Sequence, residues 1–281
     1  MTNIAFLGTG LLGSALAEAS IRRGDRVSVW NRTPHKALAL ESAGARVAAT
    51  PAEAVSGAER IHLVLKDDPV VDDVIDQLRA GLGSTAIIVD HTTTQPDLTA
   101  ERARRLNARG IRYLHCPVFI GPAMARKAQG TILVSGPSEL FEAVKEGLQQ
   151  QAARVEYLGE RPDLAAIHKL CGNAFLIGVS ALVADVYAIG HGAGVALSET
   201  LKPLEYLNLA TVVAGRGKSM ASGDFTPSFE LTMARKDVRL MIETAADTPL
   251  AMLPGLADRM DDLIAEGNGA LDLGVLAKGS L

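Results

Sequence analysis

The 281-residue sequence has few cysteines, little excess charge and no spacing typical of a metal site. Its two cysteines, Cys116 and Cys171, cannot form a disulfide framework, which favours a reducing compartment. Neither has a Cys-x-x-Cys partner, so we interpret both as small buried hydrophobic side chains. A net charge of -4 leaves no basic surplus for nucleic acid. The six histidines show no paired ligand spacing, so we expect no metal.

The sequence also lacks a charged region followed by an apolar segment at its start, as a signal peptide would have, so we expect a cytoplasmic protein. The apolar stretch 174–197 is long enough to raise the question of a membrane span. It contains Asp185, His191 and several glycines. We therefore interpret it as a buried helix between domains and expect no membrane.

Hydrophobic residues make up 48% of the chain, enough for two domains with sizeable cores. Up to residue 161, short apolar strands alternate with helices, which predicts a parallel, doubly wound α/β sheet. We expect 117–123 to be a loop. From residue 162 the pattern is helical only, with a long helix over 162–191 and further helices around 197–214, 231–246 and 250–266. The sequence thus predicts a nucleotide-binding domain (1–161) and an all-α domain (162–281) for substrate and oligomerisation.

A glycine-rich turn follows the first predicted strand. Gly8, Gly10 and Gly13 have the spacing G-x-G-x-x-G, and a helix-forming segment comes next. Gly8 permits the sharp turn, Gly10 lets backbone amides approach a pyrophosphate, and Gly13 lets helix and strand pack closely. With a second strand ending roughly 20 residues further on, this pattern predicts a Rossmann-type dinucleotide site.

The second strand indicates which dinucleotide binds. It ends at Asn31, Arg32, Thr33 and, two residues later, His35 and Lys36, with no carboxylate for the ribose hydroxyls. Arginine and lysine beside a hydroxyl suit a 2′-phosphate. We therefore expect NADP(H) rather than NAD(H). The alternative is that Arg32 and Lys36 are solvated charges at the start of a helix.

Two later loops also leave the carboxyl ends of predicted strands, where ligands of such sheets lie. They place Lys66 and the segment 92–94 as candidate contacts to cofactor or substrate. The alternative for these threonines is that they cap the following helix.

Together, these features resemble the β-hydroxyacid dehydrogenase family, which includes 3-hydroxyisobutyrate dehydrogenases and glyoxylate/succinic semialdehyde reductases. The resemblance runs essentially end to end. Its motifs match 6–13, 90–96, Lys169 with Asn173 four residues on, the segment from Phe229 to Lys236 and Asp237, and 269–274.

The resemblance implies a nicotinamide-dependent oxidoreductase that interconverts a small hydroxy acid and the corresponding oxo acid or semialdehyde. It implies Lys169 as general acid/base and Asn173 as the residue that orients the substrate. The predicted cofactor contacts are Gly8, Thr9, Gly10, Leu11, Leu12, Gly13, Asn31, Arg32, Thr33, Lys36, Leu65, Lys66, Thr94 and Lys236. The predicted substrate contacts are Thr94, Phe119, Ile120, Gly121, Asn173, Phe229 and Asp237.

The chain departs from the family at the substrate loop. Where the family usually has Pro-Val-Ser-Gly-Gly, this chain has Phe119 and Ile120 before Gly121. Two apolar side chains cannot pair a carboxylate, which favours a larger, less polar or uncharged substrate. Two alternatives stay open: an NADPH-dependent imine reductase, although that group generally lacks the lysine, and a non-catalytic NADP-binding module. The apolar faces of the helical domain predict a homo-oligomer, and the resemblance implies that it is a homodimer or homotetramer.

Overall fold

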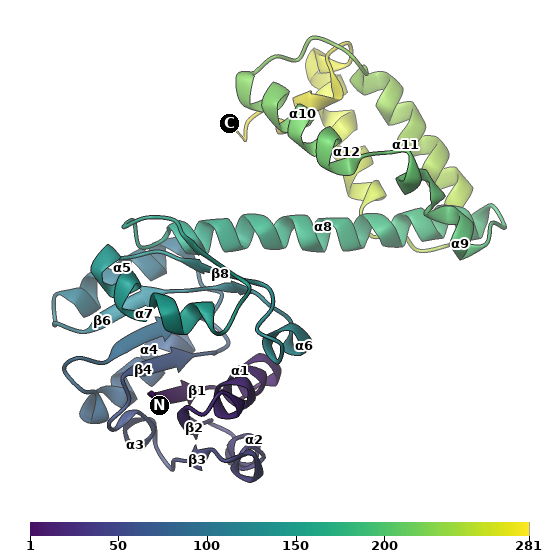
Figure 1. Cartoon of the computed structure of the whole chain (residues 1–281). Helices are drawn as coiled ribbons and strands as arrows, with labels where there is room; N and C mark the ends of the chain where they lie inside the picture. Colours follow the sequence, from purple (N-terminus) through teal and green to yellow (C-terminus); the bar gives the residue numbers. More distant parts are fainter. Residues whose placement is uncertain (281) are drawn as a thin grey trace. The chain divides into compact units, whose positions relative to one another are not determined.

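The computed structural model describes residues 1–280 (Figure 1). The chain divides into two compact units, Met1–Asn173 and the remainder from Ala174 onward, which are described separately. The first unit contains all the strands of both sheets, and the second is helical. The predicted fold class, a Rossmann-type α/β sheet followed by helices, is confirmed.

A six-stranded parallel sheet forms the centre of the first unit, in the order β3-β2-β1-β4-β5-β6. Leu7 at the end of β1 pairs with both Trp30 and Leu63, so the carboxyl ends of the three central strands lie level. The glycine-rich turn and the loops after β2 and β4 therefore leave the sheet at one edge. The strands are β1 (Asn3–Leu7), β2 (Arg26–Trp30), β3 (Arg46–Val47), β4 (Arg60–Leu63), β5 (Ile87–Asp90) and β6 (Arg112–His115).

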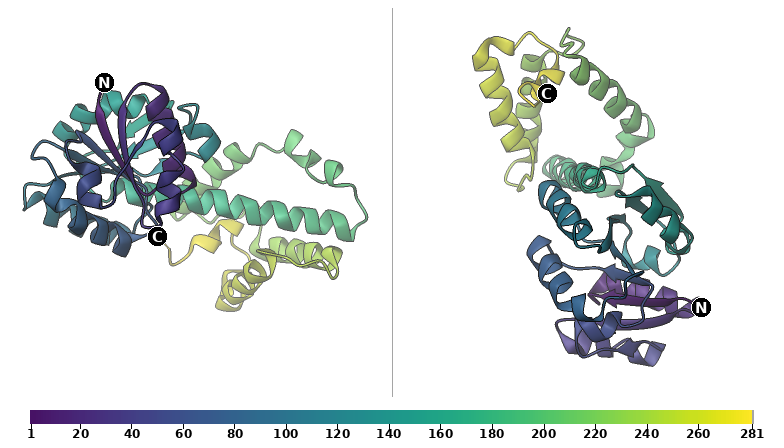
Figure 2. Two further views of the ribbon diagram at one scale, coloured as in Figure 1. Left: turned by 90° about the horizontal axis from the view of Figure 1, so that it is seen from below. Right: turned by 90° about the vertical axis from the view of Figure 1, so that its left-hand side faces the viewer.

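Helices cover both faces of this sheet (Figure 2). Alternate residues of β1 explain the two layers: Ala5 and Leu7 enter one buried cluster, and Ile4 and Phe6 enter the other. The helical elements of this unit up to β9 are α1 (Leu11–Arg22), α2 (Pro34–Leu38), η1 (Glu41–Ala43), α3 (Pro51–Val55), α4 (Asp68–Leu78), η2 (Arg79–Gly81), α5 (Pro96–Asn107), α6 (Pro122–Ala125) and α7 (Ser138–Gln149).

A second, smaller sheet corrects one expectation. Residues 117–123 do not form a simple loop, because Val118 and Phe119 form β7 (Val118–Phe119) and pair antiparallel with β8 (Thr131–Val134). β8 in turn pairs parallel with β9 (Arg154–Tyr157). The strand fixes the backbone of Phe119, one of the predicted substrate residues.

The long helix α8 (Leu164–Gly192) begins close to the predicted start. Its first turns belong to the first unit, because Ala165 and Ala166 are buried and the Ala165 amide donates to Ser135 Oγ. The expectation of a buried helix is wrong for the single chain, since Phe175, Leu176 and Ile177 are 62%, 59% and 69% exposed. By length and composition alone, α8 is the one helix of residues 1–280 that could cross a membrane.

The cysteines differ in the same way. Cys116 is buried, as predicted, while Cys171 on α8 is exposed, which corrects the interpretation of both as buried. Cys171 lies on a turn of α8 whose flanking residue Leu170 is also exposed, so the apolar pattern of this helix did not report burial.

The second unit packs one apolar cluster between α11, α12 and the C-terminal turn. Buried Asp185 on α8 accepts hydrogen bonds from the amides of Ala251, Met252 and Leu253, which begin α12. The prediction of one continuous helix over 197–214 is wrong, because the segment around Pro203 interrupts it between α9 and α10. The elements are α9 (Leu197–Thr200), η3 (Lys202–Glu205), α10 (Leu209–Ser222), α11 (Leu231–Ala245), α12 (Leu253–Leu263), η4 (Ile264–Asn268) and η5 (Leu273–Ala277).

Candidate functional site

The glycine-rich turn between β1 and α1 has the geometry that its sequence predicts. Gly8 has φ +99°, and a Cβ there would lie 2.2 Å from the Val64 carbonyl oxygen. A Cβ on Gly13 would lie 1.9 Å from the Gly8 carbonyl oxygen. Gly10 caps α1, and no atom lies within 4 Å of its Cβ position. The turn therefore needs glycine at two positions for packing and leaves open space at the third, where a pyrophosphate would approach.

Asn31 supports this turn from the end of β2. Its Oδ1 accepts from the Thr9 amide at 3.0 Å, and its Nδ2 donates to the Thr33 carbonyl at 3.0 Å. Thr9 is itself buried, and its hydroxyl has no partner among residues 1–280. The side chain of Asn31 is thus committed to holding the loop.

A cavity of about 360 Å³ lies at this edge of the sheet. It brings together eight of the predicted cofactor residues: Gly8, Gly10, Asn31, Arg32, Thr33, Lys36, Leu65 and Lys66. Arg32 and Lys36 are exposed and make no ion pair within the described chain, while Lys66 Nζ pairs with Asp67 at 3.3 Å. The open glycine turn and the two cations without an ion pair fit a phosphorylated dinucleotide.

The sequence analysis missed part of this cavity. Its further lining residues are Trp30, Val64, Val70, Asp73, Val74 and Gln77. The α4 residues among them recur at helical spacing, which could have identified them as one face of that helix. Leu11 is 83% exposed at the first turn of α1, and Leu12 packs partly into the core.

The threonines after β5 are used inside the protein. Thr92 Oγ1 accepts from the Leu65 amide at 3.1 Å, and buried Thr94 lies 2.7 Å from Thr99, oxygen to oxygen. Asp90 accepts from the Tyr113 hydroxyl at 2.8 Å, and burial raises the pKa of its carboxyl group. These contacts brace the loops at the carboxyl ends of β4 and β5, and a ligand contact for Thr94 stays a prediction.

Lys169 is the one predicted catalytic lysine, and it lies in an apolar setting on α8. Its side chain is 9% exposed, and Nζ donates to Asn173 Oδ1 at 2.9 Å. The ammonium also lies 4.2 Å from the centroid of the Phe119 ring. Burial lowers the pKa of Lys169 from its ordinary value. The structure therefore brings Lys169, Asn173 and Phe119 together within the first unit.

Phe119 reaches this position because α8 has a glycine opposite it. A Cβ on Gly172 would lie 2.2 Å from Cζ of the ring. Ile120 next to it packs partly into two buried clusters, and Gly121 caps α6. From this loop, the aromatic ring of Phe119, rather than a hydroxyl or a backbone amide, is thus the group that faces the lysine.

The remaining predicted residues belong to the second unit. Lys236 Nζ lies 2.7 Å from Asp237 Oδ1, and both side chains are partly exposed. Phe229 packs against the apolar cluster, and its amide donates to Asp272 Oδ2. Asp272 also pairs with Arg216. Burial alone would raise the pKa of Asp272, but hydrogen bonds from Gly274, Ser228 and Phe229 hold it well below the usual range. The roles of Phe229, Lys236 and Asp237 at the site stay predictions.

No sequence signal pointed to a buried pair of histidines, because an isolated histidine in a strand (His62) or just after one (His91) carries no motif. His91 Nδ1 lies 2.7 Å from the Cys116 carbonyl, so it donates, and its Nε2 accepts from His62 Nδ1 at 2.9 Å. His62 Nε2 accepts from Gln151. Burial lowers the pKa of both rings. Within residues 1–280 no three His, Cys, Asp or Glu side chains group as metal ligands.

A glycine turn, phosphate-sized open space and unpaired cations at the carboxyl edge of a parallel sheet define a dinucleotide-binding protein. The chain belongs to the family whose model is the NAD binding domain of 6-phosphogluconate dehydrogenase, which matches residues 3–159. It is an oxidoreductase of this NAD(P)-binding family, and the predicted nicotinamide cofactor is confirmed.

Relatives of two activities cover nearly the whole chain. An NADPH-dependent reductive aminase from Aspergillus oryzae is 29% identical over 98% of this chain and 95% of its own. A 3-hydroxyisobutyrate dehydrogenase from Pseudomonas aeruginosa is 28% identical over 90% of both. The solved imine reductase from Pseudomonas sp. shares the fold, with a TM-score of 0.89 and 24% identity over 100% of this chain and 99% of that one.

Proposed function

We propose that this protein is an NADP(H)-dependent reductase that interconverts a small, weakly polar carbonyl compound and its alcohol, with Lys169 as the proton donor and acceptor. The observation that carries the proposal is the buried Lys169 ammonium, held by Asn173 Oδ1 and covered by the Phe119 ring. A lysine with no role would favour solvent over such a position.

The cofactor preference rests on the cavity after β2. Arg32 and Lys36 line it, and neither is paired with a carboxylate within the described residues. Arginine can form a bidentate fork on a phosphate, and lysine adds a second positive charge. The similarity to an NADPH-dependent relative points the same way. NADP(H) is therefore our proposed cofactor.

The chain's own contribution to the reaction is proton transfer and charge stabilisation. The nicotinamide supplies the hydride when the cofactor is bound. As hydride adds to the carbonyl carbon, the electron pair of the C=O bond moves to oxygen, and the Lys169 ammonium stabilises that charge and donates its proton to give the alcohol. Asn173 holds Nζ in place through its oxygen and leaves its amide nitrogen to orient the substrate. The lowered pKa of Lys169 helps the proton to leave in this direction.

A second candidate is reduction of a C=N bond. Phe119 favours it, because an aromatic face stabilises a cationic iminium as well as an ammonium. The reductive aminase relative supports it too. Both candidates share an apolar substrate, because neither Phe119 nor Ile120 can pair a carboxylate.

Turnover measurements separate the two candidates. NADPH oxidation is followed with glyoxylate, succinic semialdehyde, larger apolar aldehydes and ketones, and cyclic imines, using the wild type, Lys169→Met and Lys145→Met. Lys145 lies on α7 and pairs with Glu142, so it is a matched lysine away from the site. We expect apolar carbonyls to react best and Lys169→Met to lower kcat by about 10²- to 10⁴-fold, as loss of a general acid does.

The outcomes discriminate clearly. If the protein turns over imines and the Lys169→Met variant does so equally fast, the carbonyl proposal is wrong and the imine candidate is favoured. Efficient turnover of glyoxylate would contradict the apolar substrate class. NADPH binding without turnover of any of these compounds would support the third hypothesis, a non-catalytic binding module.

We further propose that the chain forms a homodimer or homotetramer through its helical unit. The support is the apolar surface on α8 and α10, where Phe175, Ile177, Val212 and Val213 are each about half exposed or more. Patches of this kind on a folded chain mark association surfaces.

A further inference from the structure

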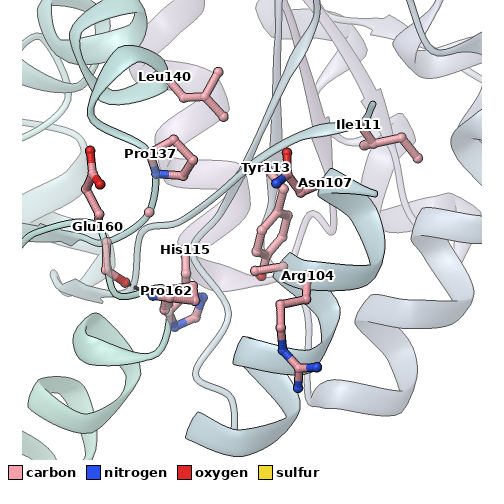
Figure 3. Close-up of a pocket in the computed structure, with 12 residues that line it drawn as sticks. Arg104, Asn107, Ile111, Tyr113, His115, Pro137, Leu140, Glu160 and Pro162 are labelled. Atoms are coloured by element: carbon pink, nitrogen blue, oxygen red, sulfur yellow. Dashed lines mark hydrogen bonds between the residues drawn. The ribbon is translucent and has the colours of Figure 1, made fainter. Parts of the chain in front are cut away.

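A second cavity in the first unit, away from the dinucleotide residues, contains an unsatisfied buried histidine. It measures about 200 Å³ and lies between α5, β6 and the start of α7 (Figure 3). It shares no lining residue with the cavity of Arg32 and Lys36. His115, at the end of β6, is 1% exposed and lines it, and its Nδ1 has no hydrogen-bond partner among residues 1–280.

The hydrogen bonds behind His115 determine which ring nitrogen carries the proton. Thr99 donates its hydroxyl proton to the Gln95 carbonyl, so the Thr94 hydroxyl must donate to Thr99. Thr94 Oγ1 can then only accept from His115 Nε2, which lies 3.4 Å away. The proton is on Nε2. Burial lowers the pKa of His115 to about 3, so the ring stays neutral at physiological pH.

Nδ1 is therefore a bare acceptor in a mostly apolar space. The side chains of Ile111, Leu140 and Pro162 form walls of the cavity. Of the other buried polar groups there, the Tyr113 hydroxyl donates to Asp90, and the Ser135 hydroxyl donates to the Pro162 carbonyl and accepts from the Ala165 amide. Both are satisfied, so among the buried side-chain polar atoms of the lining Nδ1 is the one without a partner within residues 1–280.

We propose that this cavity binds a small uncharged molecule with an apolar body and one hydroxyl group, whose O–H donates to His115 Nδ1. A ketone, an ether or a carboxylate has no proton to give. Arg104 and Glu160 both line the cavity, so its lining has no net charge that would favour a charged ligand. The size is suitable, because apolar cavities of about 150 Å³ hold a benzene ring. The ligand would contact Ser135 and Pro162, which hold the first turn of the helix that carries Lys169.

The test compares phenol with anisole, which has the same ring and no donor. Binding is followed by the imidazole ¹⁵N resonances of the histidine-labelled protein, without turnover, so the result is independent of the proposed function. In the free protein we expect the Nε2–H tautomer at His115. We expect phenol to shift the Nδ1 resonance saturably and anisole to bind about tenfold more weakly, as expected for one hydrogen bond.

Two variants separate the hydrogen bond from the cavity. His115→Phe removes the reporting ring, so its binding is followed by titration calorimetry, and it should bind phenol and anisole equally. Ala103→Leu, which fills the cavity from α5 and leaves His115 unchanged, should abolish binding of both, while Ala143→Leu on the exposed face of α7 should bind like the wild type. If His115→Phe does not fold, the Ala103→Leu variant and the comparison of phenol with anisole on the wild type still test the proposal. Three results for the wild type would overturn the proposal. They are an Nδ1–H tautomer at His115, equal affinity for phenol and anisole, and no saturable shift with phenol, as expected if the cavity takes up only water.

Discussion

The two units of this chain treat their apolar side chains differently. The first unit distributes them over three buried clusters around its sheets. The second has one buried cluster and leaves Phe175, Ile177 and Val213 largely exposed. This difference supports the proposal that another copy of the chain covers the exposed apolar surface of the second unit. Burial of each large apolar side chain would contribute about 1.5 to 3 kcal/mol.

The largest expected difference between the two units is in how their stability responds to acid. His62, His91 and His115 of the first unit are buried and neutral, whereas His191 of the second is exposed. Above pH 6.5 the rings are neutral in both the folded and the unfolded chain. Below it, only the unfolded chain takes up protons until the lowered folded-state pKa values are reached, near 3 for His115. The free energy of unfolding of the first unit should therefore decrease as the pH is lowered below 6.5, by up to about 4 kcal/mol per pH unit for three histidines.

The measurement is urea unfolding between pH 7.5 and 5, followed by Trp30 fluorescence, which reports on the first unit alone because it is the single tryptophan. His62→Gln should make the slope shallower, and the exposed matched control His35→Gln should keep it. A pH-independent midpoint would contradict the neutral buried network.

The exposed surface of the second unit gives the next largest effect. Phe175 and Val179 lie four residues apart on one face of α8 and are 62% and 50% exposed. The double variant Phe175→Asp/Val179→Asp should convert the oligomer to monomer, with a dissociation constant raised by about 100-fold or more, because two carboxylates cannot be buried unpaired. Light scattering measures the mass. Leu38→Asp, at a 51% exposed leucine of the first unit, should leave the oligomer unchanged. If the wild type is a monomer, the proposal that a partner covers the apolar surface of the second unit is wrong.

A smaller effect concerns the dinucleotide cavity. Arg32→Glu should raise the KM for NADPH by about 10- to 50-fold and leave that for NADH within about twofold, because one charge-assisted contact to a phosphate is replaced by repulsion. Arg32→Lys should recover part of the loss. Arg109→Glu, at an exposed arginine outside this cavity, is the control. An unchanged NADPH KM in Arg32→Glu would show that the guanidinium is only a solvated charge.

The smallest effect tests local structure in the first unit. The Thr50 hydroxyl accepts from the Glu53 amide at 3.1 Å at the start of α3. Thr50→Ala should reduce the free energy of unfolding by about 1 kcal/mol, as loss of an N-cap does. Thr50→Ser should restore it. Thermal unfolding measures both, and a loss in Thr50→Ser equal to that in Thr50→Ala would exclude the cap.

Sequence patterns predicted the parts of this structure that depend on neighbours in the chain. Gly8 and Gly13 were identified because a G-x-G-x-x-G turn has local steric needs. Lys169 and Asn173 were identified through the resemblance to a known family, because two polar residues on one helix face do not by themselves indicate a site. The strand at Phe119 was missed because its partner, Thr131, lies twelve residues away and offers no alternating pattern. Exposure of the α8 surface was missed because an apolar helix looks the same whether its own chain or another one covers it.

The contact between Phe119 and Gly172 links two positions that lie 53 residues apart in this sequence. The ring occupies the volume that any side chain at Gly172 would need. A lineage that gains a side chain at 172 must therefore lose the ring at 119, and one that loses the ring leaves a gap beside Lys169. Among homologues, the residues at positions 119 and 172 are therefore expected to vary together. The residue at 172 would then indicate whether an aromatic ring covers the lysine at 169.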